Sequence, residues 1–460
     1  MGVYTTIDPV TGDQIAQYSE ISDAELDALI GRSTTAYRSW RTTPLEQRRA
    51  VLTRAAEIHR EQAEELAKIL TLEMGKPIAQ AKGEVALVAS IYQYYADHVE
   101  EYIADEPLDI TGPGPAVVRT EPIGPLVGVM PWNYPYYQVA RFAAPNIALG
   151  NTIILKHARN CPQSALAIER VLAEAGVPAG VYLNAFISSA QVANTVADSR
   201  VQGVSLTGSE KAGSAVGEVA GRHMKKCVLE LGGSDPFLVL DDADVDAAAA
   251  AAVVGRLGTG GQACTASKRF LVEERVYEEL VGKFVHGMAG WQPGDPTSPD
   301  TKLGPMASNA GVEELDELVQ DAISRGAEAL LGGNRPEGPG AYYPPTVLAG
   351  VTREMRAFSE ELFGPVAVVY RVGSMDEAID LANDSPFGLS SSVFTSDPEK
   401  ADRVAEELET GMVWINGTSK SSPDLPFGGV KGSGFGRELA KFGLNEFANK
   451  KLVRNPKGTK

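Results

Sequence analysis

Cys264 is the residue of this sequence whose type and setting best suit a nucleophile. It lies in GGQACTASKR, residues 260–269, among small side chains and directly after a glycine cluster. A thiolate attacks carbonyl carbon readily, and a helix N-terminus or a positive charge beside it lowers the pKa of the thiol. The glycine-rich lead-in is compatible with a helix N-terminus at this point. The alternative is an inert core cysteine, since free cysteines are often buried as small apolar residues.

Two polar residues within apolar surroundings suit supporting roles. Glu230 interrupts the apolar segment LELGG, and burial raises the pKa of a carboxyl toward the range of a general base. An ion pair with Lys225 or Lys226 is the structural alternative. Asn133 stands between a predicted strand and a helix that begins with proline, so its amide can donate to a developing oxyanion. It can equally cap that helix.

A third feature suits an anion. In SLTGSEKAGSAVG, residues 205–217, a strand leads through Thr207, Gly208 and Ser209 into a helix. Glycine permits close approach of the backbone, and the N-terminus of the helix offers free N–H groups and a positive dipole to a pyrophosphate. The pattern is not G-x-G-x-x-G, so a structural turn remains the alternative.

Composition narrows the classes of function. The chain of 460 residues has 42 basic and 60 acidic residues and a net charge of −18, which disfavours binding to nucleic acid or an anionic membrane. Three scattered cysteines indicate a reducing compartment, and the five histidines show no metal-ligand spacing, so no metal is expected. The N-terminus lacks a secretory pattern and no segment is apolar enough to span a bilayer; we expect a cytoplasmic protein.

The elements that must position these residues follow from patterning. Apolar residues at helical spacing predict a helix over 43–70, with Thr43 as its N-cap and Pro44 in the first turn. From about Pro125, short β-rich runs alternate with helical stretches, which indicates βαβ units and a doubly wound parallel sheet that binds ligands at the carboxyl ends of its strands. A second α/β region follows LELGG. Residues 106–122 and the C-terminal segment are predicted strands without a partner, and such edges usually pair with another chain.

Seven motifs, in family order along nearly the whole chain, resemble those of the aldehyde dehydrogenase superfamily. They are PWNYP (131–135), LKHA (155–158), LTGSEKAG (206–213), LELGG (229–233), GQAC (261–264), EELFGPV (360–366) and PFGGVKGSGFGREL (426–439). Glu230 and Cys264 are 34 residues apart, which is also the usual interval in the family. Any one motif is weak evidence, but seven in order leave little room for chance.

The resemblance implies an α/β fold of the aldehyde dehydrogenase type. Residues 1–106 and 123–232 would form a Rossmann-like NAD(P)-binding domain, and residues 233–432 an α/β catalytic domain. Residues 107–122 and 446–460 would be the oligomerisation strands of a homodimer or homotetramer.

The resemblance also assigns catalytic roles. Cys264 would attack the aldehyde, while Asn133 and the backbone N–H of Cys264 hold the oxyanion. Hydride transfer to the nicotinamide would leave a thioester, and Glu230 would activate the water that hydrolyses it. Some relatives carry a second cysteine two positions after the nucleophile and close a disulfide switch. Here that position is Ala266, so the switch is expected to be absent.

The resemblance implies cofactor contacts at seven residues, and Arg159 is an eighth candidate at a position that departs from the family pattern. Lys156 and Ser209 would contact the adenosine and phosphate end, Glu361 the nicotinamide ribose, and Phe363 the ring. Trp132, Gly208 and Leu231 complete the set, although the residues alone favour a packing role for Trp132. NAD-preferring members often have glutamate where this chain has Arg159. A guanidinium there can bind a 2′-phosphate, which favours NADP or dual use over NAD alone, unless Arg159 points to solvent.

Within the superfamily, the sequence is most similar to the shorter bacterial succinate-semialdehyde dehydrogenases. Their substrate carries a carboxylate, and Arg141 lies two helical turns beyond Asn133, where it can point into the same tunnel unless it is a surface arginine. Ser421 matches a serine that helps to hold this carboxylate. Glutarate semialdehyde or an aliphatic aldehyde is the alternative substrate. A cysteine hydrolase lacks a supporting histidine, and Glu230 opposes an acylating, CoA-dependent relative.

Overall fold

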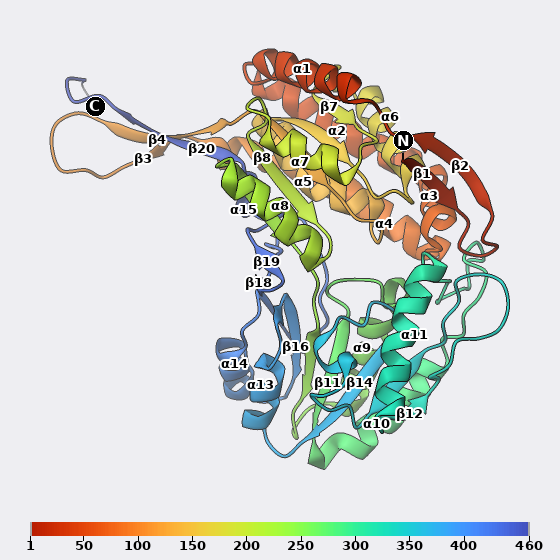
Figure 1. Ribbon diagram of the computed structural model, residues 1–460. Coiled ribbons are helices and arrows are strands. Elements are labelled where there is room, and N and C mark those ends of the chain that lie inside the picture. The colour runs from red at the N-terminus through yellow and green to blue at the C-terminus, as the bar shows by residue number, and fades with distance from the viewer. Residues whose placement is uncertain (1, 459–460) are drawn as a thin grey trace.

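The computed structural model describes residues 2–458 and contains two mainly parallel sheets, each with one antiparallel edge strand and each covered by helices on both faces (Figure 1). The first is a six-stranded sheet of order β19-β9-β8-β5-β6-β7. Only β19 runs antiparallel to its neighbour. Its strands are β5 (Pro125–Val129), β6 (Thr152–Lys156), β7 (Tyr182–Asn184), β8 (Gly203–Thr207), β9 (Lys226–Glu230) and β19 (Gly434–Phe435).

Helices bury both faces of this sheet, which explains why its strands read as apolar runs. One face packs on α1 (Asp23–Trp40), α7 (Ser189–Ala197) and α8 (Glu210–Arg222). The other packs on α2 (Leu45–Glu61), α3 (Ala63–Met74), α4 (Ile78–Ile103), α5 (Pro135–Leu149) and α6 (Pro162–Glu174). A small antiparallel pair, β1 (Val3–Ile7) and β2 (Gln14–Ser19), lies beside α3 and α6. The described part of the chain has no helix long and apolar enough to cross a membrane.

The second sheet has seven strands in the order β12-β13-β14-β11-β10-β16-β17. They are β10 (Asp235–Val239), β11 (Ser267–Glu273), β12 (Glu328–Leu331), β13 (Thr346–Ala349), β14 (Val366–Val372), β16 (Ser390–Phe394) and β17 (Met412–Ile415). Its helices are α9 (Val245–Leu257), α10 (Glu274–Ala289), α11 (Asn309–Ser324), α12 (Arg356–Ser359), α13 (Met375–Asn383) and α14 (Pro398–Glu407). A two-stranded pair, β15 (Phe387–Gly388) and β18 (Val430–Lys431), joins this region to β19.

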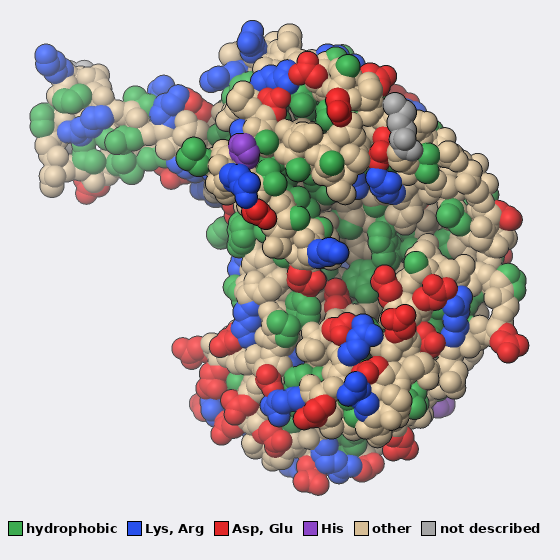
Figure 2. Space-filling model, in the orientation of Figure 1, with side chains coloured by type: hydrophobic (Ala, Val, Ile, Leu, Met, Phe, Trp, Pro, Cys, Tyr) green, Lys and Arg blue, Asp and Glu red, His purple; other side chains and the backbone are tan. Residues whose placement is uncertain are grey.

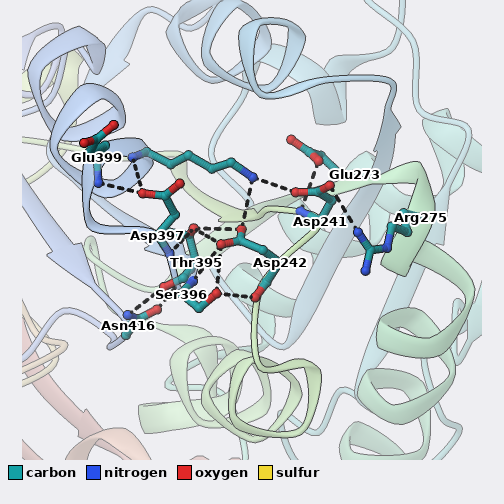
Figure 3. Close-up of polar contacts among 10 residues, drawn as sticks. Asp241, Asp242, Glu273, Arg275, Thr395, Ser396, Asp397, Glu399 and Asn416 are labelled. Atoms are coloured by element: carbon teal, nitrogen blue, oxygen red, sulfur yellow. Dashed lines mark hydrogen bonds and ion pairs between the residues drawn. The ribbon is translucent and has the colours of Figure 1, made fainter.

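Polar side chains form a hydrogen-bonded network at the carboxyl ends of β10, β11 and β16, on the side away from the first sheet (Figure 3). Asp242 accepts from the hydroxyl of Thr395 at 2.8 Å, and Lys400 donates to Asp241 at 2.7 Å. Lys400 of α14 contacts both Asp241 and Asp242, so this network ties α14 to the end of β10.

An arm formed by three strands projects from the body of the molecule (Figures 1 and 2). In this arm β4 (Ala116–Pro122) pairs antiparallel with both β3 (Glu106–Pro107) and β20 (Ala448–Arg454). The helix α15 (Ala440–Glu446) directly precedes β20. The two segments that the sequence left without a partner therefore pair with each other. Leu452 of β20 remains 62% exposed.

The predicted single helix over 43–70 is wrong in two respects. The helix begins at Leu45 with Pro44 as its N-cap residue, and it is divided at Gln62 into α2 and α3. Thr43 does not cap it, because its hydroxyl donates to the Ser39 carbonyl at 3.2 Å. The break lets α3 turn onto α6 as well as α4.

Candidate active site

Cys264 lies in the loop that carries the chain from α9 into β11. Thr259, Gly260 and Gly261 in this loop all have positive φ, a conformation that glycine adopts without strain. No helix begins at Cys264, since the next element is β11, which starts at Ser267. The sequence allowed a helix N-terminus here, but none begins at this point; of the two options, the structure places positive charges, those of Arg141 and Lys268, near the thiol.

Two cavities meet at Cys264. One, of about 300 Å³, is lined by Gly83, Leu87, Tyr134, Tyr137, Gln138, Arg141, Ala263, Cys264, Thr265, Ser419, Lys420, Ser421 and Phe427. The other, of about 290 Å³, is lined by Pro131, Trp132, Asn133, Thr207, Gly208, Ser209, Leu231, Gly232, Cys264, Glu314, Glu361 and Phe363. Figure 2 shows this side of the molecule hollowed between the two sheets. A thiol at such a junction can meet a different molecule from each side.

Burial opposes ionisation of the thiol. It raises the pKa of Cys264 to about 12, and the positive charges of Arg141 and Lys268 act in the opposite direction. Both cations come from other elements, Arg141 from α5 and Lys268 from β11. Arg141 and Lys268 are therefore the two buried cations that favour a thiolate at Cys264.

Asn133 is buried just before the N-terminal end of α5 and lines the second cavity. Its Nδ2 donates to the Gln262 carbonyl at 3.1 Å, two residues before Cys264. Its Oδ1 accepts from the Tyr134 N–H at 3.1 Å, and α5 itself has no side-chain cap. The helix-cap alternative is thus wrong. The second N–H of the amide is available to a ligand beside Cys264.

Arg141 forms part of one polar wall of the first cavity. It is fully buried and pairs with Glu438, and its Nη2 donates to Thr207 Oγ1 at 3.2 Å. Its Nη1 is 3.4 Å from the Tyr137 hydroxyl, which donates to Ser421 Oγ at 2.8 Å. The surface-arginine alternative is excluded by this burial. Arg141 and Ser421, 280 residues apart in the chain, lie together in this wall.

Glu230 is buried at the end of β9, next to Arg141 and Glu438. Neither of its carboxylate oxygens has a hydrogen-bond partner within residues 2–458. Burial raises the pKa of Glu230 well above its usual value, while Arg141 lowers it and Glu438 raises it further. Lys225 and Lys226 do not pair with it; both donate to backbone carbonyls elsewhere. The carboxyl is set up to bind a proton.

The second cavity has an aromatic and an acidic side. Phe363 packs edge-on against Trp132, with ring centroids 5.5 Å apart. Glu361 accepts from the Gly233 N–H at 3.1 Å, and its Oε1 is 3.3 Å from the ammonium of Lys268. Leu231 completes this side. The arrangement offers a flat apolar slot beside a carboxylate, which suits an aromatic ring that is joined to a sugar.

The N-terminus of α8 opens onto the same cavity. Ser209 is the N-cap residue, and its hydroxyl accepts from the Ala212 N–H at 3.4 Å. Gly208 donates its N–H to the Glu230 carbonyl at 3.0 Å, which joins this turn to β9. The free N–H groups of the first turn fit a phosphate.

A separate basic patch lies at the end of β6. Lys156 forms no hydrogen bond or ion pair within residues 2–458, and burial, followed by the charge of Arg159, lowers its pKa to about 8. Arg159 pairs with Glu20, and both cations lie 5.8 Å from the centre of the Tyr4 ring. The side chain of Arg159 is 48% exposed. A phosphate between these cations would relieve their repulsion, so the residues fit an anionic group of a cofactor.

The sequence missed two buried charges of the site. Glu438, in the last motif, holds Arg141, and Lys268 reaches the loop that carries Cys264. A signal existed for Lys268, because a lysine within the apolar run SKRFLV requires a partner once it is buried. Glu438 offered no local signal.

The fold and the site agree with the comparison to known families. Residues 2–453 match the aldehyde dehydrogenase family, and the chain belongs to that family. Its relatives include a protein of Deinococcus radiodurans named succinate-semialdehyde dehydrogenase (NADP+). The two are 54% identical over 452 residues, which cover 98% of this chain and 94% of that protein. A protein of the same name from Mycobacterium bovis is 44% identical, covering 97% and 98%.

Solved structures show the same likeness. A succinic semialdehyde dehydrogenase from Streptococcus pyogenes, in complex with NADP+ as the cofactor, superposes with a TM-score of 0.97. It is 41% identical, and the match covers 98% of this chain and all of that one. A succinate-semialdehyde dehydrogenase from Burkholderia pseudomallei is 35% identical with a TM-score of 0.96, covering 99% and 95%.

Proposed function

We propose that this protein oxidises succinate semialdehyde to succinate with NADP+ as the hydride acceptor. The observation that carries the proposal is the position of Cys264 between two cavities of different chemistry. One has a guanidinium and a serine in its wall, as a carboxylate requires. The other has an aromatic slot and a carboxylate, as a nicotinamide riboside requires. The names of the relatives at 54% and 44% identity support both assignments.

The chemistry begins at Cys264. Its thiolate attacks the aldehyde carbon to form a thiohemiacetal, and the free N–H of the Asn133 amide and the backbone N–H of Cys264 stabilise the oxyanion. When bound, NADP+ supplies the acceptor for the hydride that leaves this carbon, and a thioester on Cys264 remains. Glu230 takes a proton from the water that hydrolyses the thioester, which releases the acid and the free thiol.

Two clusters are proposed to set specificity. Arg141 and Ser421 would hold the substrate carboxylate through charge-assisted hydrogen bonds. Lys156 and Arg159 would hold the 2′-phosphate of NADP+. Ser209 and Gly208 would bind the pyrophosphate at the start of α8, and Glu361 would bind the ribose. Phe363, Trp132 and Leu231 would contact the nicotinamide. The acceptance of NAD is expected to be weaker, because NAD lacks the 2′-phosphate and leaves Lys156 without an anion.

We also propose that the arm mediates assembly into a homodimer or homotetramer. Leu452 of β20 is 62% exposed, and β20 forms an edge of the three-stranded sheet. Residues 107–122 and 446–460 would then be the assembly strands, residues 1–106 and 123–232 the cofactor domain, and residues 233–432 the catalytic domain.

Initial rates of NADPH formation with succinate semialdehyde, glutarate semialdehyde and propanal test the substrate assignment. The variants Arg141→Lys and Ser421→Ala are each expected to raise KM for succinate semialdehyde about tenfold, since each loses a hydrogen bond to a charged group. KM for propanal should stay unchanged. Ser419→Ala is the matched control, because Ser419 lines the same cavity outside the cluster. Equal efficiency with propanal in the unmodified protein would contradict the proposal.

A further inference from the structure

Lys268 is a fully buried lysine whose ammonium lies beneath the nucleophile loop. It belongs to β11, and its Nζ donates to the carbonyls of Ala263, Cys264 and Ala266 at 3.3, 2.9 and 3.2 Å. Three hydrogen bonds use all three of its donors. The main chain on both sides of Cys264 is therefore fastened to one side chain.

The same ammonium reaches the second cavity. Its Nζ is 3.3 Å from Oε1 of Glu361, and that oxygen also accepts from the Gly233 N–H. Oε2 of Glu361 has no hydrogen bond within residues 2–458. Glu361 is thus held by one oxygen and offers the other to the cavity. Lys268 links the backbone of the nucleophile to the acidic wall of the cofactor cavity.

Packing alone does not account for a lysine here. A buried ammonium is costly to desolvate, and an apolar side chain of similar length would fill the space without that cost. Two neighbouring buried cations show the contrast. Arg256 and Arg269 donate only to backbone carbonyls, and neither forms an ion pair within residues 2–458. Of these three, only Lys268 touches both the nucleophile loop and a carboxylate of the site.

We propose that Lys268 is a positioning residue for the dehydrogenase reaction. Its ammonium fixes the main chain that carries Cys264, fixes the Glu361 carboxylate in the cofactor cavity, and favours the ionised thiol. The inference rests on the proposed function for the meaning of the cofactor cavity. The contacts of Lys268 with the loop and with Glu361, and its effect on the Cys264 thiol, do not require a bound cofactor. They can therefore be tested in the free protein without turnover.

Four charged groups act on the thiol. Arg141 on α5 and Lys268 on β11 favour the thiolate; Glu361, in the loop before β14, and Asp235 on β10 disfavour it. Asp235 is itself buried, and burial raises its pKa to about 7. Removal of the Lys268 charge leaves Arg141 as the one cation opposing burial and two carboxyls. Formation of the thiolate must then move to higher pH.

Two variants separate the charge from the hydrogen bonds. Lys268→Met removes both, whereas Lys268→Gln removes the charge and keeps a donor. Lys225→Met is the matched control, because Lys225 also donates its Nζ to two backbone carbonyls, those of Asp198 and Val201, away from the site. The first readout is the rate at which iodoacetamide modifies Cys264 in the free protein, followed by mass spectrometry of its peptide. Cys161 and Cys227 give separate peptides.

At about pH 8 both Lys268 variants should be alkylated about tenfold more slowly than the unmodified protein, while the control is unchanged. The second readout is the Kd for NADP+ by calorimetry, which should rise in Lys268→Met because Glu361 loses its support. Lys268→Gln should recover part of that affinity and part of kcat, since it keeps a donor. Alkylation rates and Kd values within twofold of the unmodified protein in both variants would overturn the inference.

The two proposals fail in different ways. If the unmodified protein forms no NADPH with any of the three aldehydes, the proposed function fails, whatever the alkylation rates are. If it is active and the Lys268 variants match it, only the role of Lys268 fails. If Lys268→Met does not fold, Lys268→Gln decides the inference through its alkylation rate alone.

Discussion

Glu230 is the residue whose proposed role depends most on its surroundings. Its carboxyl is buried beside Arg141 and Glu438, and burial holds its pKa well above the usual range. It lines neither of the cavities at Cys264 and lies beside Gly428 instead. To act on water at the thioester, the side chain must turn from Gly428 toward Cys264. The orientation of Glu230 in this structure therefore differs from the one that the proposed hydrolysis requires.

Replacement of this carboxyl should divide the reaction into its two halves. In Glu230→Gln the attack of Cys264 and hydride transfer proceed, whereas hydrolysis of the thioester slows. We expect a burst of about one NADPH per subunit, followed by a rate at least about a hundredfold lower, as is typical for loss of a general base. Rapid-mixing absorbance at the NADPH band measures both phases. A variant that turns over steadily without a burst would contradict the assignment.

The pH dependence has a definite sign. A general base must be ionised, so kcat should rise with pH as Glu230 loses its proton, and the raised pKa places this rise above the usual range of a glutamate. The rise should be lost in Glu230→Gln.

Residue types alone were informative at this scale where the chemistry is local. Cys264, Glu230 and Asn133 stand out in the sequence because each is a polar or reactive group within an apolar or glycine-rich setting. Glu438 does not, since its partner Arg141 belongs to α5, far away in the chain, and Lys268 gave only the weaker signal of a lysine within an apolar run. The helix N-terminus that the sequence allowed at Cys264 does not form, because glycines there serve a turn with positive φ.

Among the elements, α5 carries Arg141 and directly follows Asn133, and it is held at its start by α4. Glu84 of α4 accepts from the N–H groups of Tyr136 and Tyr137 at 2.9 and 3.1 Å. Its other oxygen pairs with Lys76, which is fully buried and lies 3.8 Å from the centre of the Tyr134 ring. A carboxylate from another helix thus replaces the missing cap of α5 and complements its dipole.

This arrangement predicts a large loss of stability from a small change. Glu84→Gln leaves the Lys76 ammonium buried without an anion, which should lower the free energy of unfolding by about 3–5 kcal/mol. Urea unfolding followed by circular dichroism measures the loss. The double variant Glu84→Gln with Lys76→Met should regain part of it, since no charge is then stranded. A double variant no more stable than Glu84→Gln would show that the ion pair is not the cause.

Elements were predictable from the sequence where periodicity decides them. The β-rich runs from Pro125 onward became strands of two parallel sheets, because strands buried on both faces must be apolar. The helix over 43–70 was placed less well. Its start depends on whether Thr43 turns toward the helix or toward the preceding turn, and its break depends on where α6 lies.

At the scale of the whole molecule, the arm has an edge at β20 that stays unpaired within residues 2–458, and an exposed leucine, Leu452. If it mediates assembly, a charge on its apolar surface should weaken that assembly. Leu452→Arg is expected to shift the protein to smaller species, measured by light scattering after size exclusion. Ile15→Arg is the control, since Ile15 of β2 is 49% exposed and lies outside the arm. An unchanged mass for Leu452→Arg would place any interface elsewhere.

One residue that lines the cavity beside Arg141, Gly83, has no proposed role in catalysis or binding. Gly83 of α4 lines it, and a Cβ built at Gly83 would meet no atom within 4 Å. Alanine, valine or leucine at this position would therefore shorten the chamber in steps, while Cys264, Glu361 and the basic patch stay in place. We therefore expect that a single substitution at Gly83 can change which aldehydes fit the cavity, without altering the residues proposed to carry out the oxidation.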